Sequence, residues 1–260
     1  MSLRIILKNS RLLVMIWKMI REVQLWCVGS YMKKKGHVYQ FDGIKSFFYL
    51  PNIRTDLIQK VIYLKKNYFE YETLDYVCKD HGLGVGQLIK GGVVLDIGAN
   101  IGNHTLYFCN ECDAKKVYCF EPMQETFLML QRNIVINHLE DRTILINKGV
   151  GECGAKASVS FKKDSNSGFT RLALSDIGDV EIIAIDDLNI EQKIGFVKID
   201  VEGFELAVLK GMVKTLKRDK PFLMVELWDS NFDDAVSVLE GIGYQKRLLD
   251  AHTNEYLFYT

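Results

Sequence analysis

Several features are scarce or missing in this sequence, and each absence excludes a class of protein. The formal net charge is zero, since 33 basic residues balance 33 acidic ones, so the chain has no general electrostatic attraction for nucleic acid. No run reaches the roughly 18 uninterrupted apolar residues that a membrane-spanning helix needs. Six cysteines in 260 residues are too few for a disulfide-held scaffold, and Cys109 and Cys112 have no second pair to complete a zinc site. We therefore expect a globular protein with reduced thiols, located in the cytoplasm.

Positive charge is concentrated at the N-terminus, where residues 1–36 hold eight lysines and arginines against one acid. Apolar residues recur at helical spacing over 12–26 and predict an amphipathic helix. We favour an accessory helix packed on the main domain, because such stripes usually face protein. The alternative is peripheral contact with anionic lipid at the inner membrane face. A short hairpin in 37–50 and a helix at 56–66 complete a predicted accessory segment, residues 1–66.

From residue 67 to residue 260 we predict a single domain, in which strands alternate with helices after Gly91. This alternation predicts an α/β fold with a mostly parallel, doubly wound sheet and an antiparallel edge strand. An insert at 155–185 breaks the rhythm with two β-rich runs around a Ser/Asn/Gly loop. The expected strands are Val93–Ile97, Lys116–Phe120, Thr143–Asn147, Ala157–Lys162, Val180–Ile185, Gly195–Ile199, Pro221–Leu227, Tyr244–Leu249 and Tyr256–Tyr259. The expected helices include Glu72–Lys79, Pro122–Asn137, Gly203–Leu216 and Phe232–Gly241.

The first motif, residues 94–102, follows a strand and precedes a helix, which places it at the carboxyl end of the sheet, where α/β domains bind ligands. Glycine and asparagine there allow a tight turn that brings the backbone close to a ligand. A dinucleotide site uses the spacing G-x-G-x-x-G and seats a pyrophosphate on the helix N-terminus. Here the spacing is Asp96-x-Gly98-x-Asn100-x-Gly102. The charge of Asp96 repels a pyrophosphate but suits the ammonium and sulfonium groups of S-adenosylmethionine.

Glu121 ends the next predicted strand, just before Pro122. An acid at this position accepts hydrogen bonds from both ribose hydroxyls, in nicotinamide and S-adenosyl sites alike. Taken alone, it is explained equally well as an acid that complements the dipole of the helix that we expect to begin at Pro122. After the first motif, it indicates a nucleoside-type cofactor.

Asp200 and Glu202 follow the fourth parallel strand, which lies beside the first strand at the switch point of the sheet. Because Asp200 and Glu202 are two residues apart, we expect their carboxylates to point the same way if the chain there is extended. We interpret them as groups that hold the cofactor, orient an acceptor hydroxyl or take its proton. The alternative is helix capping near Gly203. They also suit a divalent metal, but no third ligand is evident, so we predict no metal.

Other side chains are candidates for the same region. Glu226 closes an apolar strand, where an unpaired carboxylate is costly to bury, so it is either paired structurally or part of the site. His104 follows the first motif near the cofactor, although capping of the first helical turn explains it better. Phe169 and Arg171, in the insert, are candidates for lining an acceptor pocket.

These motifs, in this order, resemble the FkbM-type methyltransferase family over residues 68–228. The resemblance implies a Rossmann-like methyltransferase fold and O-methylation of sugar or polyketide hydroxyls. The matching pieces are Tyr68–Leu74, Leu95–Asn103, Phe120–Pro122, Lys198–Glu205 and Pro221–Glu226. The cofactor-binding residues that follow are Asp96, Gly98, Ala99, Asn100, Gly102, Asn103, Glu121, Pro122 and Asp200, with Asp200 and Glu202 at the reaction centre.

A sugar hydroxyl is a weak nucleophile, so methyl transfer to it requires a base within hydrogen-bond reach. We assign that role to Glu202 or Glu226, with Asp200 in a positioning role. Two rivals stay open: a nicotinamide-dependent oxidoreductase, which the loop spacing and Asp96 disfavour, and a non-catalytic S-adenosyl-binding partner protein. The expected ligands are S-adenosylmethionine and a small-molecule or glycan acceptor, without nucleic acid.

Overall fold

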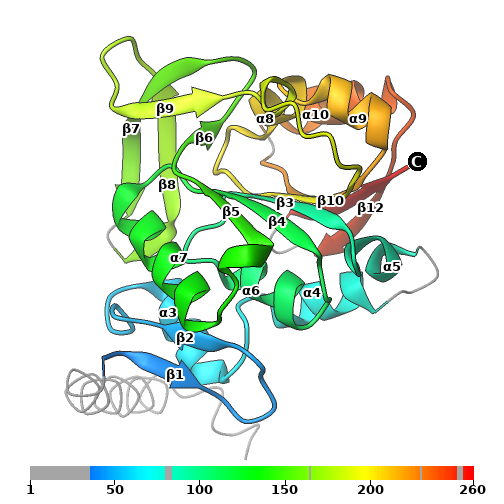
Figure 1. The fold of residues 1–260 in the computed structure, drawn as a ribbon. Coiled ribbons are helices and arrows are strands. Elements are labelled where there is room, and N and C mark those ends of the chain that lie inside the picture. The colour runs from blue at the N-terminus through cyan, green and yellow to red at the C-terminus, as the bar shows by residue number, and fades with distance from the viewer. Residues whose placement is uncertain (1–35, 80–83, 164, 229, 251–253) are drawn as a thin grey trace, which may run out of the picture.

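The computed structural model describes residues 36–79, 84–163, 165–228, 230–250 and 254–260 (Figure 1). The amphipathic helix predicted at 12–26, and the lipid contact considered for it, lie outside the described residues. Within the described ranges, no helix is long and apolar enough to cross a membrane.

The centre of the fold is a seven-stranded sheet made of β3 (Val93–Ile97), β4 (Lys116–Phe120), β5 (Thr143–Ile146), β10 (Ile194–Ile199), β11 (Phe222–Glu226), β12 (Gln245–Asp250) and β13 (Glu255–Tyr259). Its order is β12-β13-β11-β10-β3-β4-β5. The pairs that join β11, β10, β3, β4 and β5 are all parallel. β13 is antiparallel to its neighbours and lies between β11 and the edge strand β12. The switch point lies between β3 and β10, as the sequence predicts.

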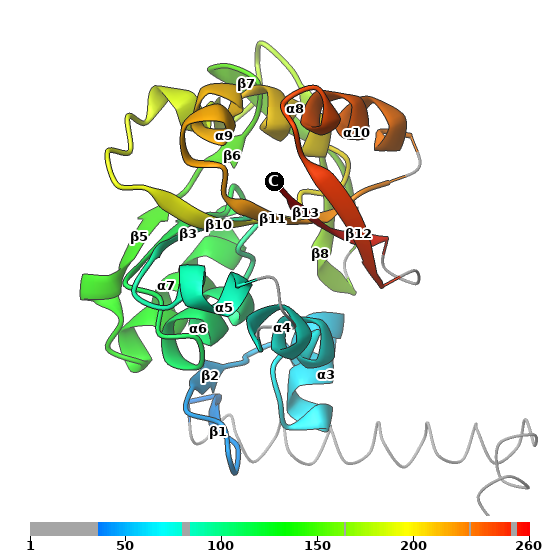
Figure 2. The same ribbon diagram turned by 90° about the vertical axis from the view of Figure 1, so that its right-hand side faces the viewer.

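Helices cover both faces of this sheet (Figure 2). One face carries α5 (Val85–Ile89), α6 (Asn103–Asn110) and α7 (Gln124–Ile136), and the other carries α8 (Glu205–Lys210), α9 (Val213–Asp219) and α10 (Phe232–Glu240). Neighbouring strand residues enter opposite cores: Val94 packs in the core that contains α6 and α7, whereas Leu95 packs in the core that contains α8 to α10. This two-residue alternation explains why the central strands β3 and β10 are apolar apart from Asp96 and Lys198, and it confirms the doubly wound fold.

Two helix predictions are wrong in detail. The helix expected over 203–216 is two helices, α8 and α9, because the chain between them lies against another backbone: a Cβ at Gly211 would stand 1.9 Å from the carbonyl oxygen of Gly151. Pro122 is not the first residue of α7, because Met123 is extended and α7 begins at Gln124.

A second, four-stranded sheet fills the predicted insert. It consists of β6 (Gly149–Val150), β7 (Ala155–Lys163), β8 (Asn166–Leu174) and β9 (Val180–Ile183), in the order β6-β9-β7-β8. The sequence predicts β7 and β9 but a loop where β8 lies. The residues of β8 are half-buried from 166 to 172 on both faces of the strand, so they show no alternation of buried and exposed positions that a pattern could reveal. Two short 3₁₀ helices, Glu140–Arg142 and Ile185–Asp187, complete the connections.

The predicted accessory elements are present from residue 36 onward as β1 (Val38–Gln40), β2 (Phe47–Tyr49) and α3 (Leu57–Lys65). The helix predicted at 72–79, in the main domain, is present as α4 (Tyr71–Cys78). β1 and β2 form the expected antiparallel hairpin, and Asp56 caps α3. Phe48 and Ile62 pack in the same core as Leu106 and Leu130 of α6 and α7. This part of the chain therefore extends the core of the main domain.

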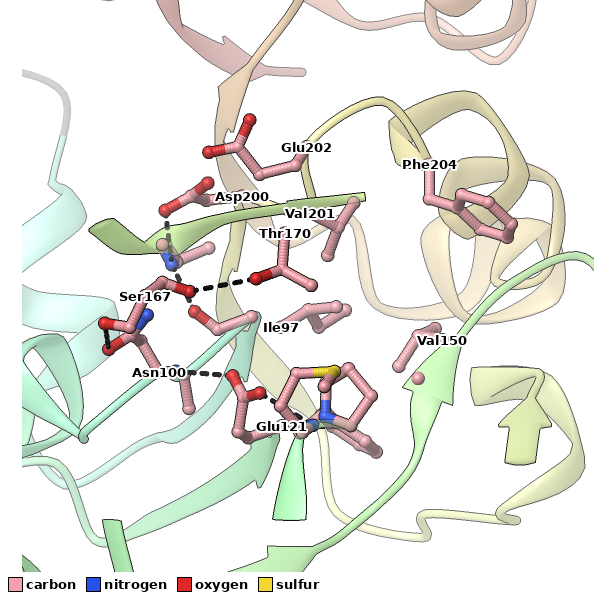
Figure 3. A pocket seen from close by; sticks show the side chains of 18 of the residues that line it. Ile97, Asn100, Glu121, Val150, Ser167, Thr170, Asp200, Val201, Glu202 and Phe204 are labelled. Atoms are coloured by element: carbon pink, nitrogen blue, oxygen red, sulfur yellow. Dashed lines mark hydrogen bonds and ion pairs between the residues drawn. The ribbon is translucent and has the colours of Figure 1, made fainter. Parts of the chain in front are cut away.

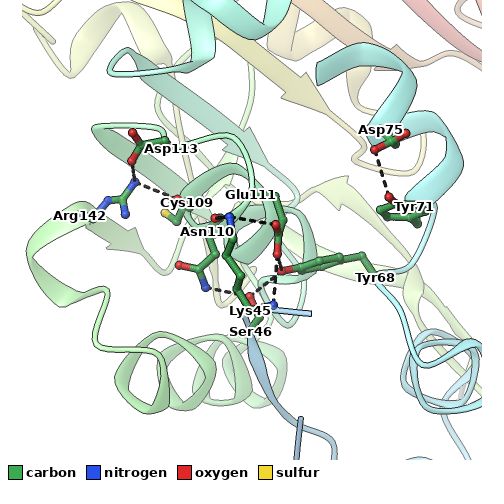
Figure 4. A network of polar contacts seen from close by, with 10 residues as sticks. All are labelled: Lys45, Ser46, Tyr68, Tyr71, Asp75, Cys109, Asn110, Glu111, Asp113 and Arg142. Atoms are coloured by element: carbon green, nitrogen blue, oxygen red, sulfur yellow. Dashed lines mark hydrogen bonds and ion pairs between the residues drawn. The ribbon is translucent and has the colours of Figure 1, made fainter. Parts of the chain in front are cut away.

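A polar network fastens the hairpin to the end of α6 (Figure 4). The buried hydroxyls of Tyr68 and Ser46 are 2.7 Å apart, and Tyr68 donates to Oε1 of Glu111 at 3.1 Å. Lys45 donates through Nζ to the carbonyl oxygen of Asn110 at 2.8 Å. Burial raises the pKa of Tyr68 well above its usual value, so its hydroxyl stays a donor. The network fixes Tyr68 and the hairpin at the C-terminal end of α6.

Candidate functional site

A cavity lies at the carboxyl ends of β3, β4 and β10 (Figure 3). Its walls come from the loop after β3, the end of β4, the turn after β10, and β8, which contributes Ser167 and Thr170. In Figure 3, Asp200 and Glu202 lie on one side of the cavity and Glu121 on the other. The sequence motifs therefore meet where the topology of the sheet predicts.

The loop after β3 turns through three residues with left-handed backbone: Gly98 (φ 80°), Asn100 (φ 51°) and Gly102 (φ 86°). A Cβ at Gly98 would stand 1.8 Å from the carbonyl oxygen of Asp200, so only glycine fits there. The N–H groups of Gly98 and Ala99 both donate to the carbonyl oxygen of Phe120, at 3.0 and 2.9 Å. The loop is thus locked against β4 and β10 before any ligand binds.

Glu121 lies at the end of β4 with its carboxylate beside this loop. Oε2 accepts from the N–H of Asn100 at 3.0 Å, and Oε1 accepts from the N–H of Met123 at 2.9 Å. Burial raises the pKa of Glu121 to about 7, against the opposing effect of these two hydrogen bonds. A carboxylate oxygen has two lone pairs, so each oxygen can accept a further hydrogen bond from a ligand.

Lys198 is the central cation of the site, and it is nearly fully buried. Its Nζ donates to the carbonyl oxygen of Gly98 at 2.8 Å and lies 3.1 Å from Oδ2 of Asp200 and 3.7 Å from Oδ1 of Asp96. Burial alone would lower the pKa of Lys198, but the two carboxylates outweigh burial and raise it, so the lysine is charged.

Asp96 requires a correction of the charge argument made from the sequence. Its side chain is fully buried, its Oδ2 accepts from Thr105 Oγ1 at 2.6 Å, and it is not among the residues that line the cavity. Its charge is balanced by Lys198, so it is not available to attract a cationic ligand or to repel a phosphate. The carboxylates that line the cavity are Glu121, Asp200 and Glu202.

The chain after β10 does not continue as a strand. Glu202 (φ 55°) and Gly203 (φ 107°) turn the backbone, so the expectation that Asp200 and Glu202 project together from extended chain is wrong. Both side chains nevertheless line the cavity. The N-terminus of α8 has no side-chain cap, and Glu205 accepts from the N–H of Gly203 at 2.7 Å, so helix capping does not explain the two acids.

Three acids with different proton affinities meet here. The pKa of Asp200 is lowered: burial opposes this, but the charge of Lys198 outweighs it. Burial and the charge of Asp200 raise the pKa of Glu202 to about 8. Burial, the charge of Asp200 and a hydrogen bond with Asp200 raise the pKa of Glu226 to about 10. Near neutral pH, Glu226 is therefore protonated and donates to the Asp200 carboxylate, while Glu202 is close to its titration point.

The segment from Tyr68 to Leu74 borders the cavity, through Phe69. Asn103 fixes it: its Oδ1 accepts from the N–H of Phe69 at 2.9 Å, and its Nδ2 donates to the carbonyl oxygen of Phe69 at 3.1 Å. His104 lines the cavity and places Nε2 3.4 Å from Oε2 of Glu70. His104 is therefore at the site, held by a neighbouring acid, and does not cap α6.

Most of the predicted site residues line the cavity: Gly98, Ala99, Asn100, Asn103, Glu121, Pro122, Asp200 and Glu202. Asp96, Gly102 and Glu226 do not line it, although each contacts a residue or loop that does. Sequence reasoning gave no role to Lys198. Its signal in the sequence was a lone lysine in an apolar strand, two residues before Asp200. Sequence reasoning also missed the wall formed by Ser167, Gly168, Thr170 and Leu172 of β8.

A ligand cavity at the switch point of a doubly wound sheet defines an α/β domain that binds a nucleotide-like cofactor. Residues 96–246 match the family model described as the methyltransferase FkbM domain. The chain belongs to the FkbM methyltransferase family, as the sequence motifs predict.

Two curated relatives and one solved structure place the match in context. The hexuronic acid methyltransferase AglP of Haloferax volcanii is 31% identical over 52% of this chain and 55% of its own length. The methyltransferase sdnD of Sordaria araneosa is 23% identical over 58% of this chain and 71% of its own length. A crystal structure of an FkbM methyltransferase from Methylobacillus flagellatus aligns with a TM-score of 0.49 and 24% identity, over 64% of this chain and 43% of that one. The chain thus spans about half the length of the first of these relatives and less of the solved structure.

Proposed function

We propose that this chain is an S-adenosylmethionine-dependent methyltransferase that acts on a hydroxyl of a sugar or a related natural product. The observation that carries the proposal is the carboxylate lining of the switch-point cavity by Glu121, Asp200 and Glu202. Membership of the FkbM family makes methyl transfer the expected chemistry. AglP is named as a methyltransferase of a hexuronic acid, which supports a sugar as the acceptor.

The cavity suits a nucleoside that carries positive charge. Because Glu121 is buried, its ionised carboxylate is stabilised by the hydrogen bonds that it accepts. The two hydroxyls of a ribose can donate further hydrogen bonds to it. The loop from Gly98 to Asn100 and the neighbouring Asp200 would hold the rest of the cofactor. When bound, S-adenosylmethionine supplies an electrophilic methyl group on a positively charged sulfur.

A pyrophosphate does not suit the same cavity. Its negative charge would lie among the acids Glu121, Asp200 and Glu202. The two described lysines that line the cavity are already paired, Lys198 with Asp96 and Asp200 and Lys148 with Glu181. The nicotinamide alternative is therefore still disfavoured, but on account of the carboxylates that line the cavity. Glu202, an acid that lines the cavity with its pKa raised to about 8, favours a catalytic site over a non-catalytic binding protein.

Glu202 is the acid best suited to act as the base. During transfer, the acceptor oxygen forms a bond to the methyl carbon, the bond from that carbon to sulfur breaks, and the hydroxyl proton passes to the Glu202 carboxylate. Glu226 already carries a proton that it donates to Asp200, so it cannot take another. We assign Glu226 the role of positioning Asp200 through their hydrogen bond. Lys198 contacts both Asp200 and the carbonyl oxygen of Gly98, so Asp200 and Lys198 fix the turn after β10 against the loop after β3.

The cofactor assignment is tested by calorimetric titration of the full chain with S-adenosylhomocysteine and, separately, with NAD. We expect S-adenosylhomocysteine to bind and NAD not to bind. Binding of NAD without binding of S-adenosylhomocysteine would overturn the proposed function.

The catalytic assignment is tested by transfer of a radiolabelled methyl group to a glycan extract, with Asp200→Asn, Glu202→Gln and Glu226→Gln compared at saturating substrates. Glu202→Gln is expected to lower kcat by about 100- to 10,000-fold while its affinity for S-adenosylhomocysteine stays unchanged. Full turnover in all three variants would remove the assignment. The label should resist mild alkali, because a methyl ether survives where a methyl ester is cleaved. Activity should survive exhaustive chelation, which tests for a metal at Asp200 and Glu202.

A further inference from the structure

A second pocket adjoins the first. It lies between β8 and the segments that follow β10 and β11, and Leu172, Glu202 and Phe204 line both pockets. Arg171 and Trp228 line the second pocket alone. Glu202 therefore stands between a cavity that suits the cofactor and a separate space that nothing in the proposed function has yet used.

The second pocket gathers buried polar atoms that lack partners. Nε of Arg171, Oε2 of Glu202 and Nε1 of Trp228 are all buried, and none of them has a hydrogen-bond partner among the residues that the structure describes. Each unsatisfied buried polar atom costs folding free energy, about 1–3 kcal/mol. Three of the seven such side-chain atoms among the described residues gather on this one pocket, which indicates a ligand that supplies the missing hydrogen bonds. The set comprises two N–H donors and one carboxyl oxygen, which matches a ligand rich in oxygen atoms.

Arg171 is the cation of this pocket, and aromatic rings hold it in place. Its guanidinium carbon lies 5.2 Å from the ring centre of Phe169 and 4.9 Å from that of Trp228. The two rings are themselves in edge contact, with centres 5.8 Å apart. The buried Nε–H of the guanidinium has no hydrogen-bond partner among the described residues, so it is available to bind a carboxylate. No carboxylate of the described residues lies within ion-pair distance of Arg171. The charge of Arg171 nevertheless acts on Glu202, whose pKa it lowers against the larger effect of burial.

We propose that this second pocket binds the methyl acceptor and that the acceptor is an acidic sugar, whose carboxylate binds Arg171 while a hydroxyl reaches Glu202. The proposal rests on the proposed function, because it gives Glu202 the acceptor hydroxyl as its substrate. A monovalent carboxylate balances the single guanidinium, whereas a dianionic phosphate would exceed it and face Glu202 and Asp200. The aromatic rings beside Arg171 suit the apolar face of a pyranose.

The experiment uses two probes that differ only at the group assigned to Arg171: 4-nitrophenyl β-D-glucuronide and 4-nitrophenyl β-D-glucoside. Each is titrated into the full chain saturated with S-adenosylhomocysteine. We expect the wild-type chain to bind the glucuronide about 10- to 100-fold more tightly, and Arg171→Gln to abolish this difference, because a charged hydrogen bond has been removed. Arg171→Lys should retain part of it, since it keeps the charge without the planar fork.

Lys162→Gln is the matched control, because Lys162 lies on the same β7–β8 hairpin, is exposed and does not line either pocket. It should leave the glucuronide preference unchanged. Equal affinity of the wild-type chain for the two probes, including the case in which neither binds, overturns the inference, as does a preference that persists in Arg171→Gln. Failure of S-adenosylhomocysteine to bind would instead remove the proposed function, so the two failures are distinguishable.

Discussion

The two pockets that share Glu202 differ in how their polar groups are held. In the cofactor cavity, each oxygen of Glu121 accepts a backbone N–H, and Lys198 lies between two carboxylates. In the second pocket, Nε of Arg171 and Nε1 of Trp228 are buried without partners in the described part of the chain. A polar group with partners in the protein supports the fold, whereas one without them costs stability and is available to a ligand. The polar groups at the β3 and β4 ends of the cofactor cavity are thus fixed in advance. His104 Nε2 and Glu202 Oε2, which also line that cavity, and the N–H donors of the second pocket lack hydrogen-bond partners among the described residues and are available to ligands.

The largest effect is expected at Lys198. Lys198→Met removes the cation that lies between Asp96 and Asp200. It leaves the fully buried Asp96 carboxylate without its ion-pair partner and the partly exposed Asp200 carboxylate beside an apolar side chain. Breaking a buried ion pair on one side costs about 3–5 kcal/mol of folding free energy. The measurement is urea unfolding followed by circular dichroism at neutral pH.

Lys210→Met is the control for that variant, because Lys210 is exposed at the end of α8 and its Nζ is 4.0 Å from Glu152 Oε2. It should change the free energy of unfolding by less than about 0.5 kcal/mol. A loss of stability in Lys198→Met no larger than in Lys210→Met would contradict the view that the cofactor cavity depends on its internal charges.

The pH dependence of catalysis is the next largest effect. Glu202 must be ionised to take a proton, and its pKa is raised to about 8, so below that pH the ionised fraction falls about tenfold per pH unit. We expect kcat/KM to rise by roughly 50-fold from about pH 6 to about pH 8 and to level off above about pH 9. Because Asp200, Glu202 and Glu226 interact, the apparent pKa belongs to the group of three. If kcat/KM of the wild-type chain were already independent of pH at about pH 6, another group would have to be the base. The same would follow if Glu202→Gln showed the same increase of kcat/KM with pH.

The two regions also differ in how far the sequence predicts them. The motifs around Gly98, Glu121 and Asp200 follow strands that are buried on both faces, so their continuous apolar runs locate the strand ends and the cavity between them. Asp96 shows the limit of that approach. Its position was predicted, but its partner was not, because strand order brings Lys198 into register beside it and no local pattern contains that pairing.

The second pocket was harder to predict because it depends on β8 and on turns. β8 has no buried face, so its residues resemble a loop in sequence, and Arg171 and Phe169 were candidates without a stated geometry. Trp228 enters the pocket from the end of β11, far from Arg171 in the sequence. Only the packing of the second sheet over the first brings these side chains together, and that packing has no short-range signature.

Cofactor affinity tests the first region on a smaller scale. Glu121→Gln keeps the size of the side chain but removes the charge, and its NH2 group cannot accept the N–H that one carboxylate oxygen now accepts. We expect the Kd for S-adenosylhomocysteine to rise by about 10- to 100-fold, measured by calorimetry. Glu125→Gln, on the exposed side of the first turn of α7, serves as the control and should not change it. An unchanged Kd in Glu121→Gln would mean that the ribose does not bind at the end of β4.

The smallest expected effect concerns Asp56, which lines neither pocket but links α3 to β8, the strand that contributes residues to both. Its Oδ1 caps α3 by accepting from the N–H of Gln59 at 2.9 Å, and its Oδ2 accepts from the N–H of Ser167 at 2.7 Å, at the start of β8. Asp56→Ala removes both bonds and should cost about 1–2 kcal/mol of folding free energy. Asp56→Asn keeps a capping oxygen and should cost less. Because β8 carries Arg171 and also lines the cofactor cavity through Ser167, the alanine variant should raise both the KM for the acceptor and the Kd for S-adenosylhomocysteine several-fold. A rise in that Kd with an unchanged acceptor KM would reverse the comparison and show that β8 serves the cofactor cavity alone.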